Sequence, residues 1–369
     1  MALCRNTKPD SLVFLLYLIV RLRSTAVIRR LRKHKMRKGN EMGIIETKGL
    51  TKIYRRYQKQ EGIVGSIKGL FHREYEEKAA VKEMDLCVEE GEFIGLIGPN
   101  GAGKTTLVKM LTGIIAPSSG MVNVMGYYPN KLENAFKKQY AIVMGQKSQL
   151  FFELTTGDTL KLFKEIYEIP HREYQQNKDY FVELFQVKDL MNVQVRTLSL
   201  GERMKMELIA ALLHNPKVLF LDEPTIGLDA VASRQMREFL KEVNREKNTT
   251  IVLTSHYMED IKMLCKRSVV VNHGCKIYDG DTEALFEKYQ KNKRISVTFP
   301  REVSLDLQSI GGIVLEEEGF KKVIGVPRES SSQAVAYIMK FSPMDITIEE
   351  EEIGKVVERI YEQEEAAYA

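Results

Sequence analysis

The fold of this chain is decided by the stretch GLIGPNGAGKTT, residues 95–106. It ends an apolar run and opens a helical pattern, so it predicts a strand, a glycine-rich loop and a helix in succession. Such glycines let the backbone curl until successive N–H groups point at a phosphate. We therefore expect a nucleotide site formed by Gly98, Pro99, Asn100, Gly101, Ala102, Gly103, Lys104, Thr105 and Thr106. Lys104 would reach the β- and γ-phosphate oxygens, and the Thr105 hydroxyl would bind Mg²⁺.

A second apolar run, VLFL at residues 218–221, ends in the carboxylates Asp222 and Glu223. Parallel strands bring their carboxyl ends to the ligand-binding edge of a sheet, so both side chains should lie beside the glycine-rich loop. We expect Asp222 to hold the magnesium through water. Glu223, one residue further out, would polarise an attacking water.

Two further polar residues follow apolar stretches in the same manner. The run TIVLTS ends at His256, which we expect near the γ-phosphate, and Gln146 follows another apolar stretch. The Gln146 amide would sense the metal or the attacking water. Both predictions depend on strand topology, since a lone histidine usually has only a structural role.

The segment TLSLGER, residues 197–203, resembles half of a phosphate site. It offers the Ser199 hydroxyl and the Gly201 backbone amide at the start of a helical pattern, but it contains no lysine. Because the first loop already binds its own triphosphate, this segment should contact the phosphate of another molecule.

Strands alternate with helices from residue 43 to about residue 285, which predicts a doubly wound α/β sheet. The runs VLFL and TIVLT lack alternation, as expected for parallel strands covered on both faces. We expect strands at 43–46, 85–88, 93–97, 218–221, 250–254 and 268–271, and helices at 105–112, 159–169, 174–185, 204–214 and 232–246. From about Arg294, short strands, the helix 331–339 and a closing helix predict a small α+β unit.

The charge is concentrated at the N-terminus. Residues 1–40 hold 11 of the 55 Lys and Arg residues and one of the 50 Asp and Glu residues, so the remaining chain is mildly acidic. We therefore expect no nucleic-acid partner. The four cysteines lack metal-site spacing, which favours small apolar fillers. The longest uninterrupted apolar run, residues 12–20, is too short to span a bilayer.

Residues 1–41 differ in composition from the rest and form a basic extension, for which two interpretations remain open. In the first interpretation, translation begins at Met42, because a strand starts cleanly after that residue. Alternatively, the extension is a partly amphipathic basic helix that lies on an anionic membrane surface.

Taken together, these motifs resemble the nucleotide-binding subunit of an ABC transporter, over about residues 44–285 and in the family's order. GPNGAGKTT resembles the Walker A motif, Gln146 the Q-loop, LSLGE the signature and VLFLDEP the Walker B motif. Gly227-Leu228-Asp229 resembles the D-loop, and His256 resembles the switch histidine. The sequence around these motifs resembles that of bacterial exporter-type ATPases that work with separate permease chains.

The resemblance implies an ABC-type ATPase domain over residues 42–290, with a helical subdomain at about 154–196 that receives the permease, and a small α+β domain over 291–369. Two ATPase domains would dimerise head to tail, as a homodimer, when ATP binds. The signature residues Ser199, Leu200, Gly201 and Glu202 would then face the ATP of the partner, and Asp229 would couple the two sites. Tyr54, or else Tyr57, would stack on adenine, although the insertion 55–78 blurs the alignment there.

Two features depart from the family pattern. The usual LSGGQ is LSLGE here, with Leu200 and Glu202 as the changed residues, and the basic N-terminus is not part of the pattern. Because Glu223 and His256 are both present, we expect an active site. The expected function is ATP hydrolysis with Mg²⁺ that drives export through transmembrane permeases, at the cytoplasmic face of the membrane. The alternatives are a soluble ABC ATPase of translation or DNA maintenance, and an ATP-binding module without turnover.

Overall fold

The computed structural model describes residues 43–57, 75–145, 147–255, 257–289 and 291–351. Its central sheet has six strands in the order β5-β6-β7-β3-β8-β9. The first five of these pair in parallel, and β9 pairs antiparallel with β8. Their bounds are β3 (Phe93–Ile97), β5 (Tyr140–Met144), β6 (Val218–Asp222), β7 (Thr250–Thr254), β8 (Arg267–Asn272) and β9 (Cys275–Asp281).

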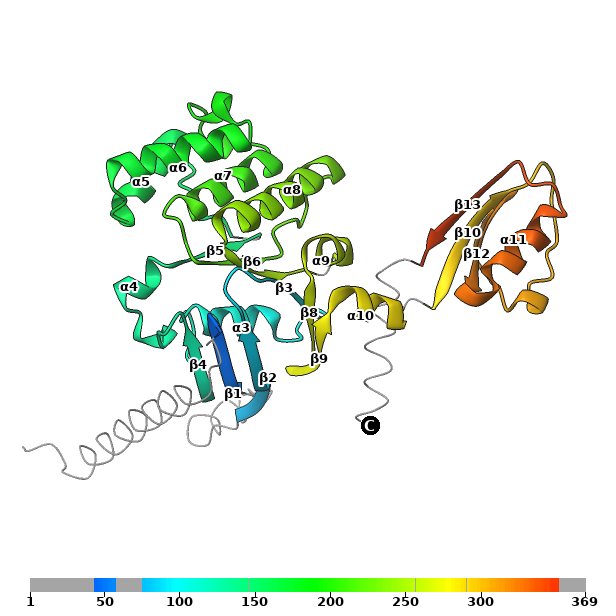
Figure 1. Cartoon of the computed structure of the whole chain (residues 1–369), viewed down its shortest axis with the longest axis horizontal. Coiled ribbons are helices and arrows are strands. Elements are labelled where there is room, and N and C mark those ends of the chain that lie inside the picture. Colours follow the sequence, from blue (N-terminus) through cyan, green and yellow to red (C-terminus); the bar gives the residue numbers. More distant parts are fainter. Residues whose placement is uncertain (1–42, 58–74, 146, 256, 290, 352–369) are drawn as a thin grey trace, which may run out of the picture. The chain divides into compact units, whose positions relative to one another are not determined.

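Both faces of this sheet are covered, as the unbroken apolar runs predict. In β6, Leu219 and Leu221 belong to one hydrophobic core, and Phe220 belongs to the other. The first core is shared with six helices, the first four of which lie along one side of the sheet in Figure 1. These are α5 (Thr156–Ile166), α6 (His171–Leu184), α7 (Leu200–Leu212), α8 (Ala230–Lys247), α9 (Met258–Leu264) and α10 (Thr282–Tyr289).

The second core lies around α3 (Lys104–Leu111), the helix that follows the glycine-rich loop. A three-stranded antiparallel sheet in the order β2-β1-β4 covers it on the other side. The strands are β1 (Ile45–Tyr57), β2 (Tyr75–Val88) and β4 (Ser119–Val124), and the short helix α4 (Asn134–Lys137) precedes β5. Helix α3 therefore packs between the two sheets, with its N-terminus next to the loop that follows the carboxyl end of β3.

The predicted C-terminal α+β unit is present and has a core of its own. Its antiparallel sheet runs in the order β11-β12-β10-β13, and α11 (Ser331–Met339) packs on it. The strands are β10 (Asn292–Thr298), β11 (Ile313–Glu318), β12 (Lys321–Pro327) and β13 (Asp345–Glu350). The closing helix predicted after β13 and the basic extension 1–41 lie outside the described residues.

Several predicted boundaries were wrong. The strands expected at 43–46 and 85–88 belong to the longer β1 and β2, whose polar outer halves pair with each other from Lys52 to Tyr57. Helix α7 begins at Leu200 rather than 204, because Ser199 caps it, and α5 begins at Thr156 because Thr155 caps it. Strands β4, β5 and β9 and helices α4, α9 and α10 were not predicted.

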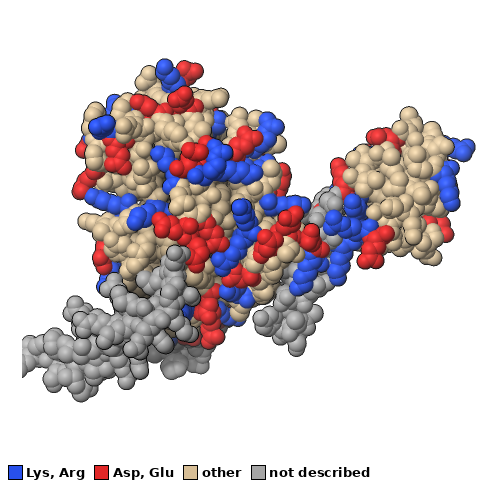
Figure 2. All heavy atoms as spheres, in the orientation of Figure 1, with Lys and Arg blue, Asp and Glu red and all other residues tan. Residues whose placement is uncertain are grey.

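On the face shown in Figure 2, acidic and basic side chains of the described residues are interspersed. Within the described ranges, no helix is long and apolar enough to cross a membrane.

Candidate functional site

Two glycines of the glycine-rich loop lie too close to neighbouring backbone to carry a side chain. A Cβ on Gly98 would lie 2.4 Å from the carbonyl oxygen of Val271, and one on Gly103 would lie 2.2 Å from that of Ala80. Gly103 also has a φ of 110°, which L side chains rarely adopt. Any side chain at these positions would therefore displace the loop from the neighbouring backbone.

Helix α3 begins at the end of this loop without a side-chain cap at its N-terminus. Side chains do cap three other helices, Thr155 for α5, Ser199 for α7 and Asp229 for α8, whereas α9 at the end of β7 is uncapped like α3. The first N–H groups of a helix need an acceptor, and the helix dipole makes that position favourable for an anion. The N-terminus of α3 is thus built to receive a phosphate.

Lys104 is the first residue of α3 and is 6% exposed. Its ammonium donates to the carbonyl oxygens of Gly98, at 2.6 Å, and Pro99, at 3.1 Å. Burial lowers the pKa of Lys104, while the charges of Glu223 and Asp222 oppose that shift. A buried cation among oxygens at a helix N-terminus complements a polyphosphate.

Asp222 ends β6 and lies between two threonines. The Thr105 hydroxyl donates to its two carboxylate oxygens at 3.1 and 3.0 Å, and the Thr254 hydroxyl of β7 donates to Oδ1 at 2.5 Å. The predicted meeting of Thr105 and Asp222 is therefore present. Thr254 was not singled out from the sequence, although it precedes Ser255-His256 at the end of an apolar run.

The backbone at Glu223 is held in a sparsely populated conformation, with a φ of 54°. Its N–H donates to the Thr254 carbonyl at 3.0 Å, and the position of a Cβ on Gly145 lies 2.2 Å from its carbonyl oxygen. Only glycine at 145 permits this approach. Nine other described non-glycine residues also have a positive φ, so the contacts with Thr254 and Gly145, rather than the φ value alone, distinguish Glu223.

Ser199 and Glu202 form a capping box at the start of α7. The Glu202 N–H donates to the Ser199 hydroxyl at 3.3 Å, and the Ser199 N–H donates to the Glu202 carboxylate at 2.9 Å. The Ser199 hydroxyl also donates to that carboxylate at 2.8 Å, and these bonds lower the pKa of Glu202. Glu202 is thus the N3 residue of a capping box that stabilises the N-terminus of α7, a role that the sequence comparison with LSGGQ did not predict.

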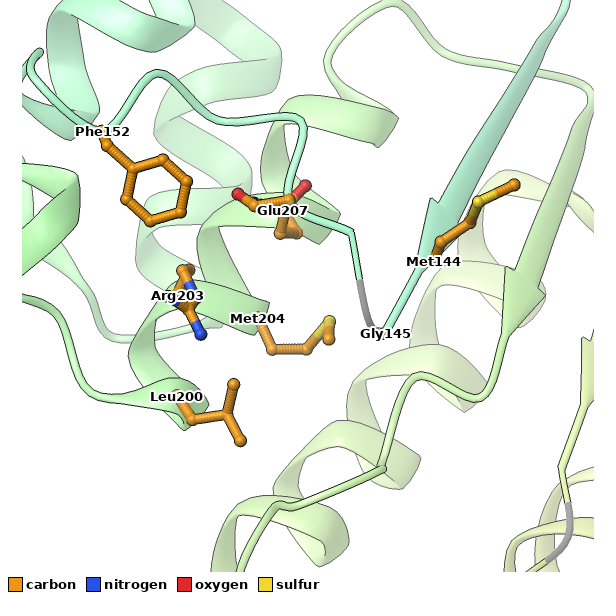
Figure 3. Close-up of a pocket in the computed structure, with 8 residues that line it drawn as sticks. Met144, Gly145, Phe152, Leu200, Arg203, Met204 and Glu207 are labelled. Carbon is orange, nitrogen blue, oxygen red and sulfur yellow. Dashed lines mark hydrogen bonds between the residues drawn. The ribbon is translucent and has the colours of Figure 1, made fainter.

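Leu200, the other departure in the signature segment, packs against the chain's own D-loop segment. Its Cδ2 lies 3.0 Å from the position that a Cβ on Gly227 would take. The side chain also lines a pocket of about 170 Å³ between α7 and the end of β5 (Figure 3). The pocket is lined by Met144, Gly145, Ser148, Phe152, Leu200, Arg203, Met204 and Glu207.

Replacing Leu200 with glycine should cost stability more than activity. The variant loses half-buried apolar packing on Gly227, which we expect to lower the free energy of unfolding by about 1–2 kcal/mol. ATP turnover should change by less than about threefold, because the Ser199 cap and the Gly201 amide remain. Denaturant unfolding and phosphate release measure the two effects. A gain in turnover of about tenfold would instead make Leu200 a brake on catalysis.

The remaining predicted residues are placed as follows. Asp229 caps α8 through the Ala232 N–H at 2.7 Å. Tyr54 is 42% exposed on β1, with the Lys52 ammonium 5.3 Å from its ring centre. Gln146 and His256 lie outside the described residues. Glu207 of α7 was missed by sequence reasoning, although a glutamate next to the apolar run 208–213 was a visible signal.

These features define the class of protein. The site combines a glycine-rich loop that carries a buried lysine with a threonine that is hydrogen-bonded to the aspartate at the end of β6, two strands away from β3 in the sheet. A glutamate follows that aspartate. This is the site of a P-loop nucleotide hydrolase. The sequence model of the family described as ABC transporter matches residues 81–226.

Curated relatives agree with that match. The chain is 32% identical over 238 residues to the ABC transporter ATP-binding protein NatA of Bacillus subtilis, which covers 64% of this chain and 91% of that protein. It is 32% identical over 224 residues to the linearmycin resistance ATP-binding protein LnrL of the same organism, covering 61% and 71%. It is 35% identical over 216 residues to the Nod factor export ATP-binding protein I of Burkholderia thailandensis, covering 58% and 70%.

Solved structures show the same fold. One is described as the dimeric structure of a post-hydrolysis state of the ATP-binding cassette MJ0796 bound to ADP and Pi. It matches with a TM-score of 0.53 and 22% identity, over 64% of this chain and 98% of that one. The chain belongs to the ABC transporter ATP-binding family, and it is an ATP-hydrolysing subunit with the cassette fold of that family.

Proposed function

We propose that this subunit closes on ATP as a head-to-tail homodimer and drives export through separate transmembrane permeases, at the cytoplasmic face of the membrane. The observation that carries the proposal is the Lys104–Thr105–Asp222 arrangement, which supplies the nucleotide half of a site. The other half would come from the N-terminus of α7 in a second copy. Export is supported by two relatives whose names describe Nod factor export and linearmycin resistance.

The residues around Asp222 fit Mg²⁺. Thr105 and Asp222 offer hard oxygen atoms at bonding distance from each other. Among the described residues, no group of three or more His, Cys, Asp or Glu side chains could hold a metal. In ATPases, Mg²⁺ takes one or two protein ligands and completes its shell with phosphates and waters, which Thr105 and Asp222 suit. When bound, the ion neutralises charge on the β- and γ-phosphates.

In this mechanism, the loop 98–103 and the uncapped N-terminus of α3 bind the phosphates, and Lys104 exchanges its carbonyl partners for phosphate oxygens. Glu223 polarises the attacking water, assisted by His256 and Gln146, and Tyr54 stacks on adenine. Across the dimer, Ser199 releases Glu202 and donates with the Gly201 amide to the partner's γ-phosphate, beside Leu200 and Glu202. Asp229 couples the two sites. Hydrolysis then reopens the dimer.

The permease would dock on the helical subdomain near the exposed rings of Phe151 and Phe152, which are 43% and 42% exposed. Membranes solubilised in mild detergent should yield a separate multi-span protein with the tagged chain. A Phe151→Glu variant should lose that protein and keep its ATPase rate in isolation. The control Ile114→Glu changes an apolar residue after α3 that is 52% exposed, and this variant should retain the multi-span protein. Recovery of the wild-type chain alone from membranes would contradict the proposal.

A further inference from the structure

One buried carboxylate has no part in the ATP chemistry described above. Glu207 lies in the third turn of α7, only 4% exposed. Burial of a carboxylate is unfavourable unless its oxygens are well hydrogen-bonded, so the partners of Glu207 are informative. Burial raises the pKa of Glu207, and its hydrogen bonds lower it by less.

The bonds of Glu207 all go to one loop. The Ser148 hydroxyl donates to Oε1, and the Gln149 N–H donates at 3.0 Å to Oε1 and 3.3 Å to Oε2. The Leu150 backbone N–H donates to the Ser148 hydroxyl oxygen at 3.2 Å and so holds the hydroxyl that bonds Glu207. These neutral donors come from consecutive residues just after β5, so a single side chain of α7 holds that loop.

The other end of the loop is hydrogen-bonded to β6, the strand that ends at Asp222. The Gly145 N–H donates to the Asp222 carbonyl at 2.9 Å, next to the close approach of Gly145 to Glu223. The loop after β5 therefore has one anchor on β6 and one on α7.

Helix α7 presents a continuous face to this loop. Leu200, Arg203, Met204 and Glu207 follow the i, i+3, i+4, i+7 spacing of one helix face, and they line the pocket opposite Met144 and Phe152 (Figure 3). Glu207 and the cap residue Ser199 are separated by about 12 Å of rigid helix. A shift of the cap would therefore reach the loop through Glu207.

We propose that Glu207 is a positioning residue that ties the loop after β5 to the signature helix, so that engagement of Ser199 sets the loop beside Asp222 and Glu223. This inference deepens the proposed function and rests on it. Glu207 does not touch nucleotide in this account. Its removal should lower the rate of turnover and leave binding of ATP to the loop 98–103 and α3 unchanged.

The test uses the full chain with Glu207→Gln, which keeps the shape but puts an amide against the donors. We expect kcat to fall about tenfold, with KM and the Kd of a fluorescent ATP analogue within about twofold, since small displacements near reacting groups act on the chemical step. The control Glu238→Gln removes an equally negative but exposed side chain from α8 and should leave all three values unchanged.

Ser148→Ala separates positioning from folding, because Ser148 is exposed and its loss does not threaten the core. It should lower kcat about threefold, and the double variant should be no slower than Glu207→Gln alone, as expected for two members of one interaction. Unchanged kcat in a folded Glu207→Gln or in Ser148→Ala would overturn the inference, as would additive losses. If Glu223→Gln hydrolyses ATP normally, the proposed function itself has failed; if only the Glu207 and Ser148 variants behave normally, the positioning role alone has failed.

Discussion

A Glu223→Gln variant should bind ATP as the wild type does and hydrolyse it at least about 100-fold more slowly, because the amide cannot accept the proton of the attacking water. The substitution keeps the size of the side chain. The unusual backbone at Glu223, with its φ of 54° and its N–H bonded to Thr254, should also survive. The loss should therefore appear in kcat and not in the affinity for ATP.

Phosphate release measures kcat, and equilibrium binding measures the affinity for ATP. Gel filtration with ATP reports whether the variant is a dimer. If hydrolysis reopens the dimer, the variant should elute as a stable dimer with ATP and as a monomer without it. Glu90→Gln, an exposed residue in the turn before β3, is the matched control. Normal hydrolysis by Glu223→Gln would refute the assignment of Glu223 as the polarising group.

A Lys104→Ala variant should fail at an earlier step, the binding of ATP. Lys104 is the buried cation of the loop, and the two carbonyl oxygens that it now contacts show how its ammonium is aimed. Charge-assisted hydrogen bonds contribute about 1.5–3 kcal/mol each, so the Kd for ATP should rise roughly 10- to 100-fold. Turnover at saturating ATP should fall further, because charge on the transferred phosphoryl group loses its partner.

The control for this variant is Lys109→Ala, in the last turn of the same helix. It removes the same charge and should leave the Kd within about twofold, since the effect of a charge on a helix end fades within one turn. Thermal unfolding checks that both variants are folded. Wild-type affinity in Lys104→Ala would show that the loop binds something other than the phosphates of ATP.

The sequence predicted the parts of this site that depend on local patterns. The glycine-rich loop and the carboxylates after β6 follow from residue types and from the edge at which parallel strands end, and the structure brings Thr105 and Asp222 together as expected. The α/β class and the C-terminal α+β unit followed from periodicity. The partition of 42–290 and 291–369 into domains remains a prediction.

Features that depend on long-range contacts could not be predicted. The bonds from Ser148 and Gln149 to Glu207 join positions almost sixty apart in sequence, and no local pattern encodes them. The polar halves of β1 and β2 form strands only because they pair with each other. The sequence identified Leu200 only as a departure from the usual LSGGQ, and the packing of its side chain on Gly227 could not be predicted from it. Local rules describe helix faces and strand ends, but not which surfaces meet.

The central claim is that each ATP site is shared between two copies of the chain, and a mixing experiment tests it most directly. Lys104→Ala disables the phosphate loop, and Ser199→Asp keeps a good helix cap while placing negative charge where the partner's γ-phosphate should lie. Each variant alone should be inactive. Mixed in equal amounts, they should recover up to about a quarter of the wild-type rate, because half of the dimers are mixed and each of these holds one intact site. No recovery in a mixture that contains mixed dimers, or full activity of Ser199→Asp alone, would contradict the account.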